Sequence, residues 1–465
     1  MKKESNIVSL FRISTSNFFK FSSSLIIVFI LPNLLGVENY GFYKYFLLYL
    51  SYVGVLHFGF IDGIYLHYGG QDLENLNRIK FRSFSYFFFF FQLFVSIILF
   101  VISFLLLSGY RLVIILFVIF NLIPINFTTY FQFISQITFR FKEYSKRLYL
   151  VSVLNLISVL IIYLFNLTNY LFIISFFTIT NYFLFILYIH TYKSFIFGTR
   201  QKLGHYLNEI FQLFKFGLPL MLSNLLSTLL ITIDKVFVEL YFDISVFSTY
   251  SFAFSILALI NIVINSISTV LYPLFKKIDK IALPKSYSSM NFILNLIVFW
   301  GLLIYFPVYV LLPIYLPGYV ASLPIMRIAL AGLVFTSTIF ALTHNFFKVY
   351  NKNKEFLSFG IVSIVILMVI ILISYNFSPL IENIAYSTLF GLGVWYFIIN
   401  QFLKKNYNIT FYKNLFYSFI FIILFLFLTS LENIILGGFI YFILILFFTV
   451  SKYKKIKSII KLIKY

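Results

Sequence analysis

The positions of the basic residues constrain this chain more than any other feature. Roughly fourteen apolar stretches follow one another, and 31 of the 35 Lys and Arg residues lie in alternate gaps between these stretches or at the chain ends. Cytoplasmic loops of membrane proteins retain Lys and Arg because these residues are difficult to translocate. The pattern therefore predicts a multi-pass protein of the cytoplasmic (inner) cell membrane, with both termini in the cytoplasm.

Composition agrees with a membrane protein and excludes several soluble classes. Hydrophobic residues make up 62% of the chain and charged residues 11%, which a soluble fold of this length could not accommodate. The net charge of +21 lies in short cytosolic loops, where anionic lipid headgroups are the expected neighbours, so we expect no nucleic-acid partner. The absence of Cys excludes disulfides and thiolate metal sites.

The apolar stretches predict an all-α fold with about fourteen transmembrane helices, because a bilayer-spanning helix needs about 20 apolar residues. The gaps on the non-cytoplasmic side are all short, so none can hold an extramembrane domain. The predicted spans are 14–35, 42–65, 83–108, 112–133, 149–165, 170–190, 216–234, 248–270, 291–313, 325–347, 356–375, 384–400, 415–429 and 434–450.

An internal repeat suggests two related lobes. The sequence FKEYSK at 141–146 recurs as FKVYNK at 347–352, an offset of 347 − 141 = 206. The same shift places the third span on the ninth and the fifth span on the eleventh. We therefore expect two parallel six-helix lobes, related by an axis along the membrane normal, with a central substrate cleft between them. The expected parts are an N-terminal lobe (1–192), a cytoplasmic linker (193–212), a C-terminal lobe (213–402), and two extra helices with a basic cytoplasmic tail (403–465).

Several short motifs, taken in order, resemble those of bacterial polysaccharide flippases. The first two spans contain LLGVENYG at 34–41 and FGFIDG at 58–63. The second lobe begins with FKFGLPLMLSN at 214–224 and continues with IDK at 233–235 and STYSFA at 248–253. This order is similar to the signature of O-antigen and capsule flippases of the multidrug/oligosaccharidyl-lipid/polysaccharide exporter superfamily. The resemblance covers about residues 10–400.

The resemblance implies a transporter rather than an enzyme. It implies that undecaprenyl-diphosphate-linked oligosaccharide units move from the cytoplasmic to the outer leaflet by alternating access. Membrane lipids, a polysaccharide polymerase and glycosyltransferases would be its partners. The sequence contains no Walker loop, no Gly-x-Ser-x-Gly and no His-Glu-x-x-His. We therefore expect no catalytic residue, no cofactor and no metal, and we expect a monomer.

Three alternatives remain open. A drug/cation antiporter of the same superfamily generally needs acidic residues deep in a lobe, and such residues are nearly missing here. A membrane-embedded polysaccharide polymerase or glycosyltransferase usually carries its catalytic residues in a sizeable non-cytoplasmic loop, which this chain lacks. A lipid II flippase for peptidoglycan is hard to separate from a polysaccharide flippase by sequence alone.

The four basic residues outside the cytosolic gaps are the candidate ligands for an anionic diphosphate head, because charges within spans usually face a cavity or one another. Lys44 and Arg327 lie furthest from a cytosolic gap, and we predict that both face the cleft. Arg111 and Lys235 lie near span ends, at the predicted outer rim. An Arg side chain also suits bidentate contact with phosphate oxygens.

Two acidic residues are candidates for ion coupling or for a structural ion pair. Asp62 is flanked by Gly59 and Gly63 near the cytosolic end of the second span, where it would cap a helix, pair with a loop Arg or serve in coupling. Asp234 would pair with the adjacent Lys235 or serve in proton coupling. The sequence leaves both roles open.

The topology can be tested with single-cysteine variants, since the chain has no native Cys. We expect the Asn353→Cys thiol to be protected from a membrane-impermeant reagent in intact cells and to react after permeabilisation. The Ser245→Cys thiol should react in intact cells. Labelling of Asn353→Cys in intact cells would overturn the predicted orientation.

Overall fold

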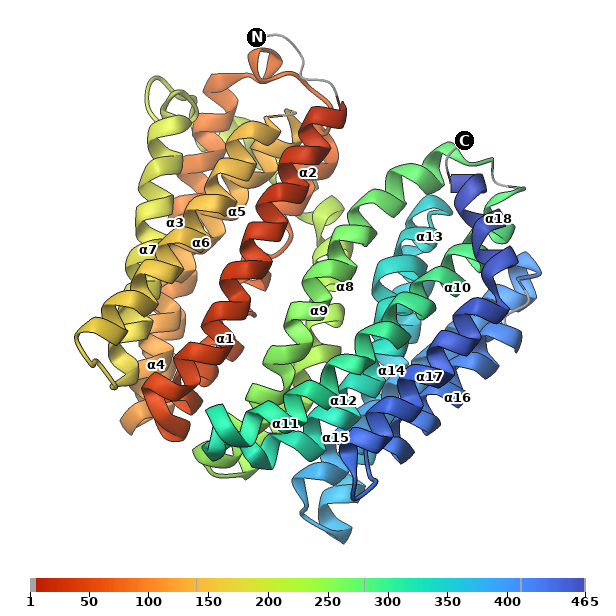
Figure 1. The fold of residues 1–465 in the computed structure, drawn as a ribbon. Coiled ribbons are helices and arrows are strands. Elements are labelled where there is room, and N and C mark those ends of the chain that lie inside the picture. The colour runs from red at the N-terminus through yellow and green to blue at the C-terminus, as the bar shows by residue number, and fades with distance from the viewer. Residues whose placement is uncertain (1–5, 139, 280, 410–411, 464–465) are drawn as a thin grey trace. The chain divides into compact units, whose positions relative to one another are not determined.

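The computed structural model describes every residue except 1–5, 139, 280, 410–411 and 464–465. The described part contains helices and no strand (Figure 1), which confirms the predicted all-α fold. It divides into two compact units, Met1–Thr228 and Leu229–Tyr465. Helix α8 (Leu207–Tyr241) contains the boundary, so it starts in the first unit and ends in the second.

The first unit begins with a helix that changes direction at Gly36. This residue has a φ of 70°, a left-handed conformation that glycine adopts without a steric penalty. The two halves of α1 therefore supply the first predicted span and the start of the second. Besides α8 and short 3-10 turns, the helices of this unit are α1 (Asn6–Leu50), α2 (Phe60–Tyr68), α3 (Arg78–Leu106), α4 (Gly109–Phe120), α5 (Leu122–Ile137), α6 (Phe141–Leu164) and α7 (Tyr170–Thr191).

The second unit contains the rest of α8 and ten further helices in its described part. A π-helical segment, Ser337–Thr343, joins α12 to α13, so these segments form one continuous helical stretch. The helices are α9 (Ile244–Lys277), α10 (Leu283–Gly301), α11 (Tyr305–Tyr315), α12 (Leu323–Thr336), α13 (His344–Val349), α14 (Asn353–Phe377), α15 (Ile381–Tyr407), α16 (Tyr412–Leu428), α17 (Ile434–Ser451) and α18 (Tyr453–Ile463).

The helices reproduce the predicted spans with one important interruption. Eleven helical stretches among the described residues are long and apolar enough to cross a membrane, and the first of them covers the first predicted span and part of the second. Helices α15 and α16, which are not among these eleven, cover the residues of the twelfth and thirteenth predicted spans. The second predicted span, 42–65, is wrong as a continuous helix, because α1 ends at Leu50 and α2 begins only at Phe60.

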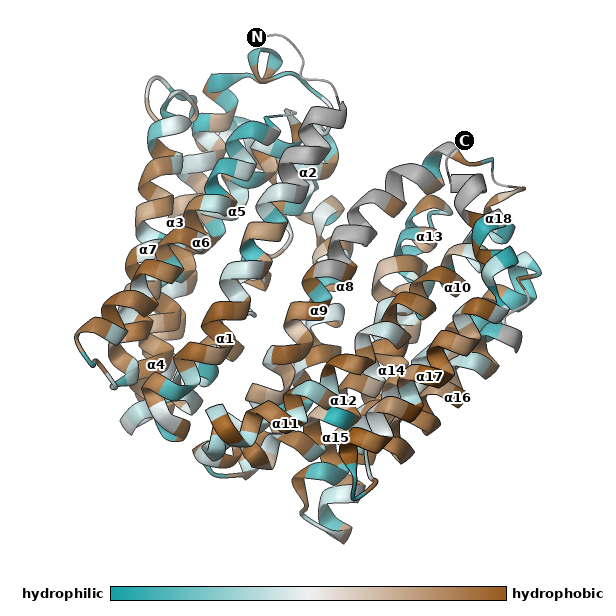
Figure 2. Cartoon of the chain, in the orientation of Figure 1, coloured by the Kyte–Doolittle hydropathy of each residue, from teal (hydrophilic) through white to brown (hydrophobic). Residues whose placement is uncertain are grey.

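The surfaces of the helices are mostly apolar, as expected for lipid contact. Figure 2 shows hydrophobic residues along much of the helix lengths and hydrophilic residues gathered near many helix ends. At the end of α3, Leu105 and Leu106 are each about three-quarters exposed (76% and 77%). In water this much exposed apolar surface would mark an association site. In a bilayer it is the surface that meets the acyl chains.

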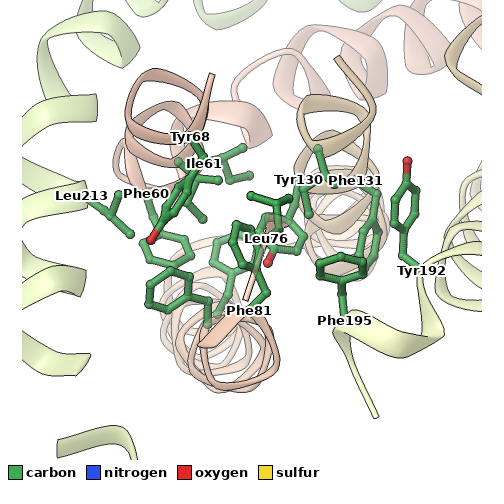
Figure 3. Close-up of a cluster of buried hydrophobic side chains, with 14 of the residues drawn as sticks. Phe60, Ile61, Tyr68, Leu76, Phe81, Tyr130, Phe131, Tyr192, Phe195 and Leu213 are labelled. Atoms are coloured by element: carbon green, nitrogen blue, oxygen red, sulfur yellow. The ribbon is translucent and has the colours of Figure 1, made fainter. Parts of the chain in front are cut away.

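The core of the first unit is built largely from aromatic rings (Figure 3). Phe60 of α2 stacks on Phe88 of α3 with ring centroids 5.4 Å apart. Phe131 of α5 stacks on Tyr192 with centroids 5.3 Å apart. Lipid tails are as apolar as these side chains, so close packing rather than the hydrophobic effect holds such helices together. Each good aromatic pair adds about 0.5–1.5 kcal/mol.

Two glycines bring α2 and α8 into backbone contact. A Cβ atom at Gly217 would lie 1.9 Å from the carbonyl oxygen of Gly59. A Cβ atom at Gly63 would lie 2.0 Å from the carbonyl oxygen of Leu213. Because the opposing atoms are backbone, no side-chain movement can make room, and small residues at such crossings are typical of membrane helices. The start of α8 therefore packs directly against α2.

Polar side chains link helices inside the second unit. Thr338 Oγ1, in the π-helical segment, lies 3.2 Å from Asn291 Oδ1 and 3.1 Å from Asn295 Oδ1 of α10. Asn295 Nδ2 donates to Ser418 Oγ of α16 at 3.1 Å. Interhelical hydrogen bonds of this kind contribute about 0.6 kcal/mol each on average in a membrane. They join α10, α16 and the π-helical segment.

The two copies of the repeated hexapeptide lie at different positions relative to the helix that follows each of them. Phe141 opens α6, whereas Phe347 lies in α13, before the turn that precedes α14. The arrangement in two related six-helix lobes stays a prediction.

The basic C-terminal tail contains a helix that the apolar pattern did not reveal. Helix α18 follows α17 and has its apolar and basic residues on opposite faces. Ile459 is buried, while Lys454 and Lys457 are exposed. This arrangement is typical of a helix that lies at the surface of a membrane.

The α2–α8 contact predicts a strong steric effect. Gly63→Ala or Gly217→Ala should destabilise the protein by about 1–3 kcal/mol or more, because each added methyl group meets backbone. The measurement is the midpoint of thermal unfolding in detergent, followed by size-exclusion chromatography. Gly54→Ala is the control, because a Cβ atom there meets nothing within 4 Å. Equal midpoints for all three variants would contradict the contact.

Candidate functional site

Lys44 and Arg111 lie in the first unit among tyrosine rings. Lys44 is half-buried in the second half of α1, with its Nζ 5.0 Å from the centroid of the Tyr40 ring. The Arg111 guanidinium, at the start of α4, lies 6.0 Å from the Tyr110 ring. The rings of Tyr45 and Tyr110, chain neighbours of the two cations, are 6.2 Å apart. The structure therefore brings both candidates to the contact between α1 and α4, where ring faces stabilise positive charge.

Lys235 lines a largely enclosed cavity in the second unit. The cavity has a volume of about 160 Å³ and is bounded mainly by α8, α9, α12 and α15. Lys235 Nζ donates to the carbonyl oxygen of Ile231 at 2.5 Å and lies 4.0 Å from the centroid of the Phe254 ring. The cavity wall is otherwise mostly apolar. Its remaining polar residues are Asn261, Thr336 and Thr388.

Arg327 lies in α12, next to the wall of this cavity. Its neighbour Ile328 lines the cavity, whereas Arg327 does not. The side chain is half-buried, and its Nε has no hydrogen-bond partner among the described residues. Its charge lies near Tyr305 of α11. Arg327 therefore retains donor capacity, because a guanidinium group carries five N–H donors.

Asp234 is fully buried and is held by neighbouring donors. The Tyr250 hydroxyl of α9 donates to Oδ2 at 2.7 Å, and the Thr388 hydroxyl of α15 lies 3.4 Å from the same oxygen. The backbone N–H of Lys235 donates to Oδ1 at 2.8 Å. Hydrogen bonds to a carboxylate are stronger than those between neutral groups. Asp234 thus connects α8, α9 and α15.

Asp62 lies at the interruption of the second span, beside a histidine. Both side chains are buried: Asp62 is 2% exposed and His57 is 5% exposed. His57 Nε2 lies 3.5 Å from Asp62 Oδ2. Asp62 occupies the first turn of α2, where the helix dipole favours negative charge. Its neighbour is therefore a histidine from the break, and not a loop Arg.

Side chains satisfy the backbone groups that the break exposes. The backbone N–H of Gly59 donates to His57 Nδ1 at 3.0 Å. Gln92 Nε2 of α3 donates to the carbonyl oxygen of Leu56 at 3.1 Å. Asn126 Nδ2 of α5 in turn donates to Gln92 Oε1 at 2.7 Å. An irregular backbone inside a membrane requires such partners, because no lipid atom can replace them.

Sequence reasoning missed most of these partners, including the contact between His57 and Asp62. The signal that could have linked them is the Phe58–Gly59 pair, whose positive φ values of 51° and 85° break the helix. It also missed Tyr250, because a contact between two successive helices depends on their packing and leaves no periodic trace in the sequence.

The fold is that of known membrane transporters. An inward-facing multidrug-resistance MATE family transporter of the MOP superfamily aligns over 90% of this chain and 96% of its own, with 13% identity and a TM-score of 0.61. The lipid II flippase MurJ in an inward closed conformation aligns over 97% and 99%, with 14% identity and a TM-score of 0.61. A MOP superfamily transporter from Pyrococcus furiosus aligns over 90% and 96%, with 12% identity and a TM-score of 0.53.

Sequence comparison gives the family. A family described as polysaccharide biosynthesis protein matches residues 9–279, which is more than half of the chain. The chain therefore belongs to the polysaccharide biosynthesis protein family. Together with the fold, this match confirms the resemblance to polysaccharide flippases of the superfamily and defines a multi-pass membrane protein. No curated protein matches the chain by sequence.

The bonds around Asp234 predict a stability effect. Tyr250→Phe removes one donor and leaves a buried carboxylate oxygen with less compensation, which should cost about 1–3 kcal/mol. The measurement is the thermal unfolding midpoint in detergent. The matched control is Tyr315→Phe, because Tyr315 is 66% exposed. A midpoint for Tyr250→Phe equal to that of the control would show that Asp234 does not depend on this donor.

Proposed function

We propose that this protein is a flippase that moves undecaprenyl-diphosphate-linked oligosaccharide units from the cytoplasmic to the outer leaflet of the cytoplasmic membrane. One observation carries the proposal: a polysaccharide-biosynthesis family match and a transporter fold occur in the same chain. Polysaccharide biosynthesis requires building blocks on the far side of the membrane, and a transporter fold supplies a route. The likeness to the lipid II flippase MurJ supports a lipid-linked substrate.

The physical task of such a flippase is to shield the polar head from hydrocarbon. Sugars and a diphosphate lose their hydration in lipid at high cost. A polar path through the protein lowers this cost, while the polyprenyl tail remains in the bilayer. Alternating access of two lobes would expose the path first to one side of the membrane and then to the other. Both termini would lie in the cytoplasm.

The charges inside the spans support an anionic substrate. The candidate ligands Lys44, Arg111, Lys235 and Arg327 are the only basic residues outside the predicted cytosolic gaps, and all four are half-buried. Arg327 retains donor capacity at its buried Nε. The two deepest candidate acids are engaged by neighbouring groups, Asp62 by His57 and Asp234 by Tyr250. The remaining donor capacity of Arg327 favours a diphosphate over a drug cation.

A genetic test separates the proposed substrate from its nearest alternative. We expect the gene to restore surface polysaccharide in a strain that lacks its polysaccharide flippase. We expect no rescue of growth when the lipid II flippase is depleted. Rescue of growth, without restored polysaccharide, would replace the proposed substrate with lipid II.

The cation hypothesis predicts graded losses of export. Lys44→Ala and Arg327→Ala should each reduce surface polysaccharide without lowering the amount of membrane-inserted protein. Arg327→Glu should reduce export further, because it adds repulsion to the lost attraction, while Arg327→Lys should retain some activity. The control is Lys354→Ala, since Lys354 is exposed in a predicted cytosolic loop. Full export by the Lys44→Ala, Arg327→Ala double variant would show that other residues contact the substrate charge.

A further inference from the structure

An open groove, here named the α15 groove, runs along α15 in the second unit. Its walls come from α14 and α16, and its volume is about 630 Å³. Helix α15 packs along α14 and α12, whereas α16 packs on α10, α12 and α17. The groove therefore lies between α15 and α16, which follow each other in the chain. The α15 residues that line it follow helical spacing and share one face: Asn383, Tyr386, Phe390, Gly393 and Phe397.

The two ends of the α15 groove differ in polarity. At the start of α15 its lining is polar and comes from Ser374 of α14 and from Asn383, Tyr386 and Ser387. Beyond these residues the lining is apolar and largely aromatic. A molecule with a polar head and an apolar chain matches this division.

The floor of the groove has the shape of a channel for a chain. Phe335 of α12 is 3% exposed, and its ring lies edge-on to the Phe419 ring of α16, with centroids 5.8 Å apart. A Cβ atom at Gly393 would lie 3.5 Å from Phe335 Cε2, so the missing side chain of Gly393 leaves room above this ring. Phe390 and Phe397 are 60% and 51% exposed. A flexible chain between these rings would gain dispersion contacts with all of them.

The length of the apolar part matches an ordinary acyl chain. From Leu389 to Phe397 the helix advances 397 − 389 = 8 residues, or about 12 Å at about 1.5 Å per residue. The hydrocarbon of one leaflet is about 15 Å thick, half of the bilayer core. Helix α15 begins after the predicted non-cytoplasmic gap 376–383, which places the polar end of the groove in the outer leaflet.

The charges around the groove select the head. Among the described residues, none that lines the groove is charged, and Arg327 of α12 is not part of the lining. The segments 356–403 and 414–451 contain no Lys or Arg, and their charged residues are Glu382 and Glu432. Glu382 is half-buried and adjoins Asn383 at the polar end. A diphosphate head would meet no cation from these segments, whereas a head with an ammonium group would meet a carboxylate.

The polar end also offers hydrogen-bond acceptors for an ammonium group. Asn383 Nδ2 donates to the carbonyl oxygen of Ser378 at 3.2 Å, so its Oδ1 can accept. Ser387 Oγ donates to the carbonyl oxygen of Asn383 at 2.7 Å, so its lone pairs can accept. An ammonium group carries three N–H donors. The hydroxyl groups of Ser374 and Tyr386 can donate to a phosphate oxygen of the same head.

We propose that the α15 groove binds one acyl chain of an outer-leaflet phospholipid whose head carries an ammonium group, as in phosphatidylethanolamine. The head lies at Glu382 and Asn383, and the chain lies along Phe390 and Phe397 above Phe335. Because the groove separates α15 from α16, the bound lipid fills the contact between them and stabilises the attachment of α16. This lipid is a structural partner, distinct from the transported substrate.

Retention of lipid by the purified protein tests the site. The protein is released from nanodiscs that contain equal amounts of phosphatidylethanolamine and phosphatidylglycerol, and native mass spectrometry identifies what stays bound. We expect one retained phosphatidylethanolamine per chain. Glu382→Gln should lower the preference for phosphatidylethanolamine over phosphatidylglycerol by about 1.4- to 5-fold, the factor expected for one partly exposed ion pair.

A matched pair of glycine variants locates the lipid. Gly393→Leu places a side chain inside the groove and should abolish retention. Gly301→Leu is the control, because Gly301 does not line the groove and a Cβ atom there meets nothing within 4 Å. Adding phosphatidylethanolamine to the delipidated protein should raise the thermal unfolding midpoint of Gly301→Leu and leave that of Gly393→Leu unchanged. Equal retention by the two variants, or a preference for phosphatidylglycerol in the parent, would overturn the proposal.

A direct readout covers the case in which a substitution prevents folding. Phosphatidylethanolamine with a photoreactive group in its acyl chain is crosslinked to the unsubstituted protein, and the modified peptides are mapped by mass spectrometry. We expect crosslinks to concentrate in α15 and α16. Crosslinks equally frequent at the exposed end of α3, at Leu105 and Leu106, would overturn the proposal. None of these readouts requires transport, so failure of the lipid site would leave the flippase proposal standing.

Discussion

The absence of water from the bilayer core is the constraint on which this structure depends. Every backbone N–H and C=O group within the hydrocarbon region must find a partner inside the protein, and helices provide these partners for most of the chain. The break before α2 departs from this rule, and side chains compensate for it. His57 accepts the N–H of Gly59, and Gln92 donates to the carbonyl of Leu56. The polar residues of this region are therefore part of the backbone structure as well as candidates for function.

Close packing is the second consequence of the same environment. Because lipid offers apolar helices no hydrophobic reason to associate, contact has to come from shape and from interhelical hydrogen bonds. Gly63 and Gly217 have no side chain, so the backbones of α2 and α8 can approach each other closely where the two helices cross. Asp234 provides hydrogen bonds among α8, α9 and α15. Both features involve α8, the helix that joins the two units.

Much of the fold could be predicted from the sequence because hydropathy and basic residues report directly on the membrane. The spans, the all-α class and the family follow from such local signals. The break at Phe58 and Gly59 could not be read this way, since its residues are as apolar as a continuous helix would be. The His57–Asp62 contact depends on that break. The hexapeptides at 141–146 and 347–352 lie at different positions relative to α6 and α14, which the sequence match alone did not reveal.

The candidate cations illustrate the same limit. Their separation from the cytosolic gaps was visible in the sequence, and it selected Lys44, Arg111, Lys235 and Arg327. What each side chain contacts was not visible, since rings such as Tyr40 and Phe254 reach them only through packing. The sequence therefore predicted which basic residues lie within the spans, and the structure shows which groups each of them contacts.

Flipping by the purified protein is the most direct test of the central claim. The protein is reconstituted into liposomes that contain an undecaprenyl-diphosphate-linked fluorescent oligosaccharide, and a membrane-impermeant glycosidase is added outside. We predict that the protected fraction of the lipid is cleaved over time in liposomes with the protein and stays protected in protein-free liposomes. Equal protection in both, with the protein inserted and folded, would contradict the account.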